Sequence, residues 1–301
     1  MRILITGGSG LLGLNWAAAL REKHDILLGI HQRPAALAGT RTVQISLDQP
    51  TEFRRQLVDL RPDLVVHAAG LSSVDGCERM PELALEVNAG LAGNAATAAR
   101  ALGIKLVHVS TDHLFAGDRA LYLEQDAPAP LNAYARTKLE GEHRVAAAFP
   151  EALIVRTNFF GWGPAGRQSI SDWILAALRA RQPLTMFSDV YFTPILASRL
   201  AARVQALVEA GASGILNVAG EERVSKHAFA LRLAAAFGLS VDTIRQGRFA
   251  EAKLAALRPR DMSLSCVLAT RLLGRSAGSL DEHLAELRAQ ERSGLAAELK
   301  R

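Results

Sequence analysis

Continuous apolar runs of about five residues alternate with longer segments of helical periodicity along the first half of the chain. Strands that are apolar on both faces are typical of a parallel sheet with helices on either side. The predicted strands are residues 2–6, 25–30, 42–45, 63–67, 105–110 and 152–157. The predicted helices between them are residues 11–23, 50–60 (with Thr51 as N-cap), 81–102 and 133–148. This alternation predicts an α/β fold with a doubly wound parallel sheet.

The pattern changes after about residue 158. The predicted elements are then helices at 171–181, 193–210 and 225–237, a strand at 214–218, and a C-terminal helix opened by a Ser279–Glu282 capping box. Thr193 as cap and Pro194 at the first position predict where the second of these helices begins. The strand at 214–218 is a candidate to return to the sheet. We therefore expect residues 1–158 with this strand to form one domain, and residues 159–301 mainly a smaller, interleaved lobe.

Composition excludes several classes of protein. Of the 301 residues, 49% are hydrophobic and 22% charged, which is ordinary for a folded domain and excludes disorder or a fibrous repeat. The net charge is only +5 and no basic run occurs, so no nucleic acid partner is expected. The N-terminus lacks the apolar segment of a signal peptide, and no apolar stretch approaches ~18 residues, so a cytoplasmic protein without a membrane span is predicted. The eight histidines lack metal-ligand spacing, so no metal is expected.

A glycine-rich segment, TGGSGLLG, directly follows the first predicted strand and opens the first helix. Gly7 would permit the tight turn, Gly10 would let a pyrophosphate approach the backbone, and Gly13 would let helix and strand pack closely. The N–H groups and dipole at a helix start favour such an anion. This context predicts a Rossmann-type dinucleotide site; the alternative is a tight structural turn.

The end of the second predicted strand reads GIHQRP and contains no acidic residue. An acidic side chain there binds the ribose 2′-hydroxyl of NAD, whereas an arginine accommodates the 2′-phosphate of NADP. Arg33 therefore favours NADP, with NAD as a further possibility. The alternative is a solvated arginine before a proline.

Tyr134 and Lys138 are four residues apart and would share one face of a helix. A lysine ammonium near a phenol is expected to lower the phenol's pKa and prepare it for proton transfer. Ser110 and Thr111 lie at the carboxyl end of the fifth predicted strand, where open α/β sheets bind ligands. An isolated Tyr–Lys pair is usually an ordinary amphipathic helix, but its place after the glycine loop and the hydroxyl pair favours catalysis.

These motifs, in this order, resemble the extended short-chain dehydrogenase/reductases, and among them the dTDP-4-dehydrorhamnose reductase group. The segments that carry the resemblance are TGGSGLLG, HAAG (67–70), VNAGLAGNAATAA (87–99), VSTDHLF (109–115), PLNAYARTKLEGE (130–142) and IVRTN (154–158). The resemblance implies an NAD(P)H-dependent oxidoreductase that reduces a nucleoside-diphosphate 4-keto-6-deoxy sugar in carbohydrate biosynthesis. Thr111, Tyr134 and Lys138 would be catalytic, with Tyr134 donating a proton to the alkoxide formed by hydride transfer.

The same resemblance implies a set of cofactor contacts. They are Gly7, Gly10, Leu11, Leu12, Gly13, Arg33, Ser46, Leu47, Ala68, Ala69, Gly70, Asn88, Ser110, Tyr134 and Lys138. For Asn88, a role in helix packing is a close alternative.

Three features depart from the group. His113 stands where a tyrosine is usual, Ser46 stands where an adenine-contacting aspartate is expected, and the segment 157–166 is the least similar. Side chains in and after that segment are candidates for the substrate pocket, although each also has an ordinary reading as core or solvated surface. They are Trp162 and Trp173 for the sugar, and Arg167, Arg258 and Arg260 for a diphosphate.

Two other functions remain open. A nucleotide-sugar epimerase would use the same scaffold, while a dehydratase is disfavoured because His113 replaces the glutamate that such enzymes carry. The regulatory beta subunit of methionine adenosyltransferase, which this group also resembles, binds NADP without catalysis. The expected partner in either enzymatic case is a small nucleotide sugar, and a homodimer is possible.

Overall fold

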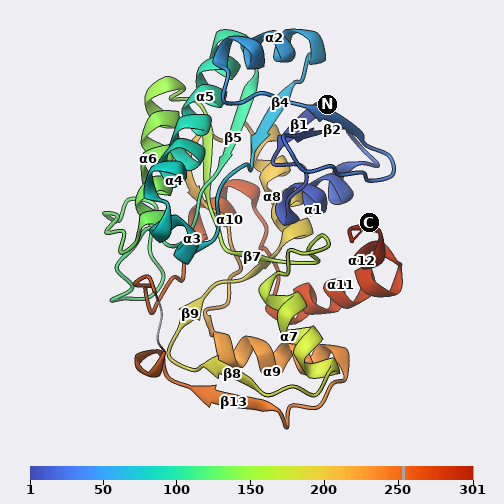
Figure 1. The fold of residues 1–301 in the computed structure, drawn as a ribbon, viewed down its shortest axis with the longest axis vertical. Helices are drawn as coiled ribbons and strands as arrows, with labels where there is room; N and C mark the ends of the chain where they lie inside the picture. The colour runs from blue at the N-terminus through green and yellow to red at the C-terminus, as the bar shows by residue number, and fades with distance from the viewer. Residues whose placement is uncertain (253–254, 301) are drawn as a thin grey trace.

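A computed structural model describes residues 1–252 and 255–300 and confirms the Rossmann-type fold (Figure 1). Its centre is a seven-stranded parallel sheet in the order β11-β6-β5-β4-β1-β2-β3. These strands are β1 (Arg2–Thr6), β2 (Asp25–Ile30), β3 (Arg41–Gln44), β4 (Leu64–His67), β5 (Lys105–Val109), β6 (Leu153–Arg156) and β11 (Gly214–Asn217).

Alternate side chains of each strand enter different cores, because successive residues of a strand point to opposite faces. Ile3 and Ile5 of β1 belong to one core and Leu4 to the other. Helices cover both faces (Figure 1). The first face carries α1 (Leu11–Leu20), α8 (Ala197–Glu209) and α10 (Val267–Leu273), and the second carries α2 (Pro50–Leu60), α5 (Leu91–Ala101) and α6 (Ala133–Ala148).

The predicted helix at 81–102 is interrupted. It consists of α4 (Pro81–Leu85), a π-helical turn η1 (Glu86–Gly90) and α5, and the short helix α3 (Val74–Arg79) before it was not predicted. The segment is helical on both sides of the π turn, so the sequence predicts one continuous helix. Thr51 is not the cap of α2, which begins at Pro50 after Gln49. The start of α8 was also wrong, because residues 195–196 form a strand instead of a first helical turn.

The lobe is built around short strand pairs and four helices. Its strands are β7 (Phe159–Phe160), β8 (Leu184–Phe187), β9 (Tyr191–Phe192), β10 (Ile195–Leu196), β12 (Val224–Ser225) and β13 (Ile244–Gly247), paired β10–β7, β12–β9 and β13–β8. Its helices are α7 (Ile170–Arg179), α9 (Lys226–Phe237), α11 (Leu280–Arg292) and α12 (Leu295–Glu298), with a 3₁₀ turn η2 (Phe249–Glu251). Between these segments the chain returns to the sheet, where β11 pairs with β6.

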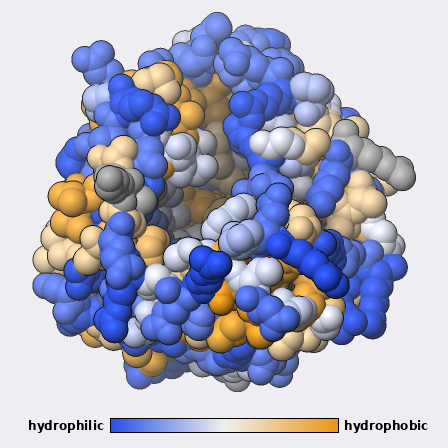
Figure 2. All heavy atoms as spheres, turned by 60° about the horizontal axis from the view of Figure 1, so that its bottom comes forward, coloured by the Kyte–Doolittle hydropathy of each residue, from blue (hydrophilic) through white to orange (hydrophobic). Residues whose placement is uncertain are grey.

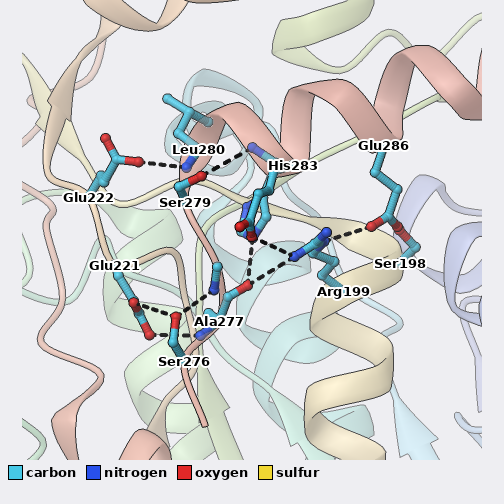
Figure 3. Close-up of polar contacts among 12 residues, drawn as sticks. Ser198, Arg199, Glu221, Glu222, Ser276, Ala277, Ser279, Leu280, His283 and Glu286 are labelled. Atoms are coloured by element: carbon cyan, nitrogen blue, oxygen red, sulfur yellow. Dashed lines mark hydrogen bonds and ion pairs between the residues drawn. The ribbon is translucent and has the colours of Figure 1, made fainter.

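Polar contacts fasten α11 to α8 and to the segment before it (Figure 3). Arg199 of α8 donates to Glu286 of α11 at 2.6 Å, and the buried His283 ring bonds the Ala277 carbonyl through Nε2 at 2.8 Å. Ser279 caps α11 as predicted, accepting from the Glu282 N–H. These contacts tie α11, which packs on α9 of the lobe, to α8 on the first sheet face.

Within residues 1–252 and 255–300, every helix is too short or too polar to cross a bilayer. Among the same residues, no cluster of three His, Cys, Asp or Glu side chains is arranged to hold a metal ion.

Candidate active site

The glycine loop between β1 and α1 leaves no room for side chains at two of its glycines. Gly7 has φ +70°, and a Cβ there would lie within 3 Å of the Ala68–Ala69 peptide. A Cβ at Gly13 would lie 2.6 Å from the Gly7 carbonyl oxygen. Gly10 is the N-cap of α1 and supplies no side chain to the first N–H groups of the helix. This bare helix start fits the pyrophosphate of a dinucleotide.

A cavity of about 540 Å³ opens beside this loop at the carboxyl ends of β1, β2 and β3. Five of the predicted cofactor residues line it, namely Gly7, Arg33, Leu47, Ala69 and Gly70. The other predicted contacts, which do not line it, are Gly10, Leu11, Leu12, Gly13, Ser46, Ala68, Asn88, Ser110, Tyr134 and Lys138. Leu11 to Gly13 belong to the first turn of α1, where their backbone shapes the loop.

The sequence missed several residues of the cavity wall. Asp48 lines the cavity, whereas the predicted Ser46 does not, and the Ser46 N–H donates to the Gln56 side chain at 3.0 Å. Leu83 and Glu86, from the interrupted helix, also contribute. The position of Asp48 just beyond β3 was the available signal, since ligands gather at strand ends.

Thr111, Tyr134 and Lys138 come together at the carboxyl end of β5. Tyr134 lies in the first turn of α6, which Asn132 caps by accepting from the Ala135 N–H at 2.9 Å. Lys138, one turn further, is buried, and its Nζ donates to the Val109 carbonyl at 2.7 Å. Thr111 is buried directly after β5, and its Oγ1 accepts from the His113 N–H at 3.2 Å. The predicted catalytic residues therefore share one corner of the sheet.

The expected lowering of the Tyr134 pKa by Lys138 was wrong for this structure. Burial raises the pKa of Tyr134 to about 12, with the neighbouring Thr111 hydroxyl acting in the opposite direction. Burial also lowers the pKa of Lys138 to about 8, against the effect of Glu142. At neutral pH the phenol is thus protonated and the ammonium charged. That is the state a proton donor needs.

A fully buried polar network lies behind Lys138. Glu142 accepts hydrogen bonds from Ser110 at 2.5 Å and from Arg156 at 2.8 Å, and both partners are also buried. Since Glu142 follows Lys138 by one turn of α6, its carboxylate offsets part of the cost of burying that ammonium. The network fixes Ser110 as a structural partner of Glu142.

Asn88 uses its polar atoms inside the protein. Its Nδ2 donates to the Leu71 carbonyl at 3.2 Å and to Thr137 at 3.0 Å, and its Oδ1 accepts from the Leu71 N–H at 2.8 Å. It clamps the loop after β4 to α6. This arrangement favours the packing role, and a contact of Asn88 with the cofactor stays a prediction.

A second cluster of polar side chains, Asp112, His113, Asn158 and Lys226, lies beside the same corner on the side of the lobe. His113 packs edge-on against the Tyr134 ring, with centroids 5.6 Å apart, and its Nε2 lies 4.0 Å from Asp112 Oδ1. Asn158 donates to Asp112 at 2.5 Å, and Lys226 from the start of α9 acts electrostatically on both Asp112 and His113. Burial raises the pKa of Asp112 and lowers that of His113. Lys226 was missed, since only the folded lobe brings it here.

The residues that the sequence offered as candidates for the substrate pocket lie in different parts of the structure. Trp162 is buried and donates from Nε1 to the Leu287 carbonyl at 3.1 Å, so it belongs to the core. Trp173 is 44% exposed on α7 and is not helix core. Arg258 bonds Asp75 at 2.9 Å and acts electrostatically on His113, so it lies near the catalytic corner, and a contact with substrate stays a prediction. Arg167 lines the cofactor cavity instead. The space-filling view shows one hollowed face, with hydrophilic residues along much of the rim (Figure 2).

The chain is similar to several curated proteins. It is 32% identical to the probable low-salt glycan biosynthesis reductase Agl14 of Haloferax volcanii, over 96% of this chain and 98% of that protein. It is 35% identical to the dTDP-4-dehydrorhamnose reductase of Mycobacterium tuberculosis, over 75% of this chain and 72% of that protein. Methionine adenosyltransferase 2 subunit beta of Rattus norvegicus is 27% identical over 88% of this chain and 80% of its own length.

The chain is also similar to solved structures of dTDP-4-dehydrorhamnose reductases. A hypothetical dTDP-4-dehydrorhamnose reductase from Sulfolobus tokodaii has a TM-score of 0.81 and 30% identity, over 93% of this chain and 98% of that chain. The dTDP-4-dehydrorhamnose reductase of Bacillus anthracis in complex with NADP has a TM-score of 0.84 and 26% identity, over 96% and 99% of the two chains. The family model of the RmlD substrate binding domain matches residues 1–292. The chain belongs to the RmlD substrate-binding-domain family.

Proposed function

We propose that this protein is an NAD(P)H-dependent reductase of a nucleoside-diphosphate 4-keto-6-deoxy sugar. The observation that carries the proposal is the meeting of Thr111, Tyr134 and Lys138 at the carboxyl end of β5, in a chain of the RmlD family. The glycine loop and the neighbouring cavity provide the cofactor site, and NADP is the preferred cofactor.

The residues divide the reaction between them. The nicotinamide supplies a hydride to the carbonyl carbon when bound. Thr111 orients the carbonyl oxygen by hydrogen bonding, and the protonated Tyr134 then gives its proton to the oxygen as negative charge develops there. In this proposal Lys138, which is charged at neutral pH, would hold the nicotinamide ribose.

The lobe supplies the rest of the substrate site in this proposal. Residues 159–301, apart from the returning strand β11, would bind the nucleotide sugar over the catalytic corner, where Lys226 and Arg258 act electrostatically on His113. A cytoplasmic location and a homodimer stay predictions.

Epimerisation is the second candidate, and His113 is the observation that favours it. Its lowered pKa leaves a neutral imidazole beside Tyr134, which is the form of a general base. A regulatory, non-catalytic role finds support in the relative from rat, but the assembled Thr111, Tyr134 and Lys138 favour catalysis.

The proposal is tested with a panel of nucleoside-diphosphate 4-keto-6-deoxy sugars and NADPH. We expect NADPH oxidation that follows formation of a reduced sugar, and Tyr134→Phe should lower kcat by about 10²- to 10⁴-fold while NADPH affinity stays near that of the wild type. Isomerised product without net NADPH oxidation would identify an epimerase. Tight NADPH binding without turnover on any sugar would favour the regulatory role.

A further inference from the structure

Two neighbouring cavities share three residues, Ser9, Arg33 and Arg167. The cofactor cavity of about 540 Å³ is lined by all three, and so is a smaller cavity of about 130 Å³ beside it. Ser9 comes from the glycine loop, Arg33 from the segment after β2, and Arg167 from the loop between β7 and α7. Lys300 lines the smaller cavity as well. Segments distant in sequence thus bring cations to one place.

The backbone of the lobe loop holds Arg167 in position. The Arg167 N–H donates to the Pro164 carbonyl at 3.0 Å, and Gly166 has φ +74°, which is the geometry of a type II turn. A Cβ at Gly163 would collide with the Arg167 carbonyl oxygen, so a glycine is required there. The Gly163 N–H donates to Asp172 of α7 at 2.7 Å, which ties the turn to that helix.

The two guanidinium groups have no carboxylate within ion-pair distance in the described part of the chain. Among residues 1–252 and 255–300, neither Arg33 nor Arg167 forms an ion pair, whereas nearby Arg21 is paired with Glu298 at 2.6 Å. Burial and the neighbouring Arg33 lower the pKa of Arg167, which shows that the like charges are close enough to repel. An anion between them would remove that repulsion and accept hydrogen bonds from both.

We propose that Arg167, Arg33 and Ser9 form a site for a phosphate monoester dianion, the ribose 2′-phosphate of NADP. The inference rests on the proposed function for the identity of the cofactor. The pyrophosphate belongs at the start of α1, while the residue after β2 faces the 2′ position of the adenosine ribose. Arg167 therefore recognises the cofactor and not the substrate diphosphate. The lobe takes part directly in the choice between NADPH and NADH.

The test measures binding without turnover, by calorimetric titration of 2′,5′-ADP and of ADP into the full chain. The variants are Arg167→Gln and Arg33→Gln, with Arg245→Gln, an exposed arginine of β13, as the matched control. We expect the wild type and the control to prefer 2′,5′-ADP. Each of the other variants should lose about 10-fold or more of its affinity for 2′,5′-ADP, with ADP changed less than about 2-fold. Arg167→Lys should restore part of the loss because it keeps the charge.

The same titrations contain the outcomes that overturn the proposal. Equal affinities of the wild type for the two probes would overturn it, as would an Arg167→Gln variant that keeps the full preference or loses both probes equally. Melting temperatures of the variants show whether they fold. A failure of the proposed function leaves a different signature, because no sugar would then be reduced although the preference for 2′,5′-ADP persisted.

Discussion

The two lysines beside the catalytic corner lie in contrasting surroundings. Lys138 on the sheet side is buried, donates to the Val109 carbonyl and is backed by the Glu142–Arg156 pair. Lys226 on the lobe side is only partly buried, and its Nζ lies 3.2 Å from the centroid of the Phe192 ring. Burial lowers both pKa values to about 8, and in each case a neighbouring carboxylate, Glu142 or Asp112, acts in the opposite direction.

The difference between the two surroundings suggests that the sheet side performs the chemical step and the lobe side recognises the substrate. The sheet side offers hydrogen-bonded groups whose positions are fixed by β5, β6 and α6. The lobe side offers charges carried on a helix start and short strands, which contact the site through Asp112 and His113. We expect changes on the sheet side to affect kcat and changes on the lobe side to affect KM.

Replacing the sheet-side lysine should have the largest effect. Lys138→Met removes the buried ammonium that would hold the nicotinamide ribose at the catalytic corner, and we expect kcat to fall about 100-fold or more. The measurement is steady-state kinetics with NADPH and the sugar identified by the panel. Lys105→Met, an exposed lysine at the start of β5, is the matched control and should leave kcat unchanged. A kcat within threefold of the wild type for Lys138→Met would remove this lysine from the mechanism.

Replacing the lobe-side lysine should have a smaller effect of another kind. Lys226→Met keeps an unbranched side chain but removes the ammonium over the Phe192 ring and the charge near Asp112, and we expect KM for the sugar nucleotide to rise about tenfold with kcat nearly unchanged. Direct titration of NADPH should show unaltered affinity. A fall in kcat that matched Lys138→Met would show that the two sides are not divided in this way.

The dependence of kcat on pH gives a further test of the sheet side, with a smaller expected effect than the lysine substitutions. Because Lys138 must stay charged, kcat should fall as pH rises through about 8, while Tyr134, with a pKa of about 12, remains protonated. Glu142 opposes the lowering of the Lys138 pKa, so Glu142→Gln should move this alkaline limb to lower pH. Gln retains an acceptor for Arg156, and a melting curve controls for lost stability. An unmoved limb would contradict the role given to Glu142.

The sequence located the sheet and the catalytic corner because their signals are local. Each apolar run of the sheet predicted its strand to within about one residue, and Tyr134 and Lys138 needed only a helix to align them. Lys226 had no local signal, since tertiary contacts alone bring it to Asp112. Arg167 was named from the sequence only as a candidate for a substrate diphosphate, because its place beside Arg33 depends on the folded lobe. The π turn at Glu86–Gly90 stayed hidden for a different reason, because the chain remains helical on both sides of it, in α4 and α5.

The return of the chain to the sheet has a consequence for folding. β11 pairs with β6 only after residues 157–213 have been made, so the edge of β6 stays open through much of synthesis. Contacts between such distant segments are slow to form, and an unpaired strand edge is a template for aggregation. A protein truncated after residue 158 would carry the whole glycine loop and the Tyr–Lys helix, yet it would expose this edge permanently. The sheet side and the lobe side of the site are therefore expected to fold together.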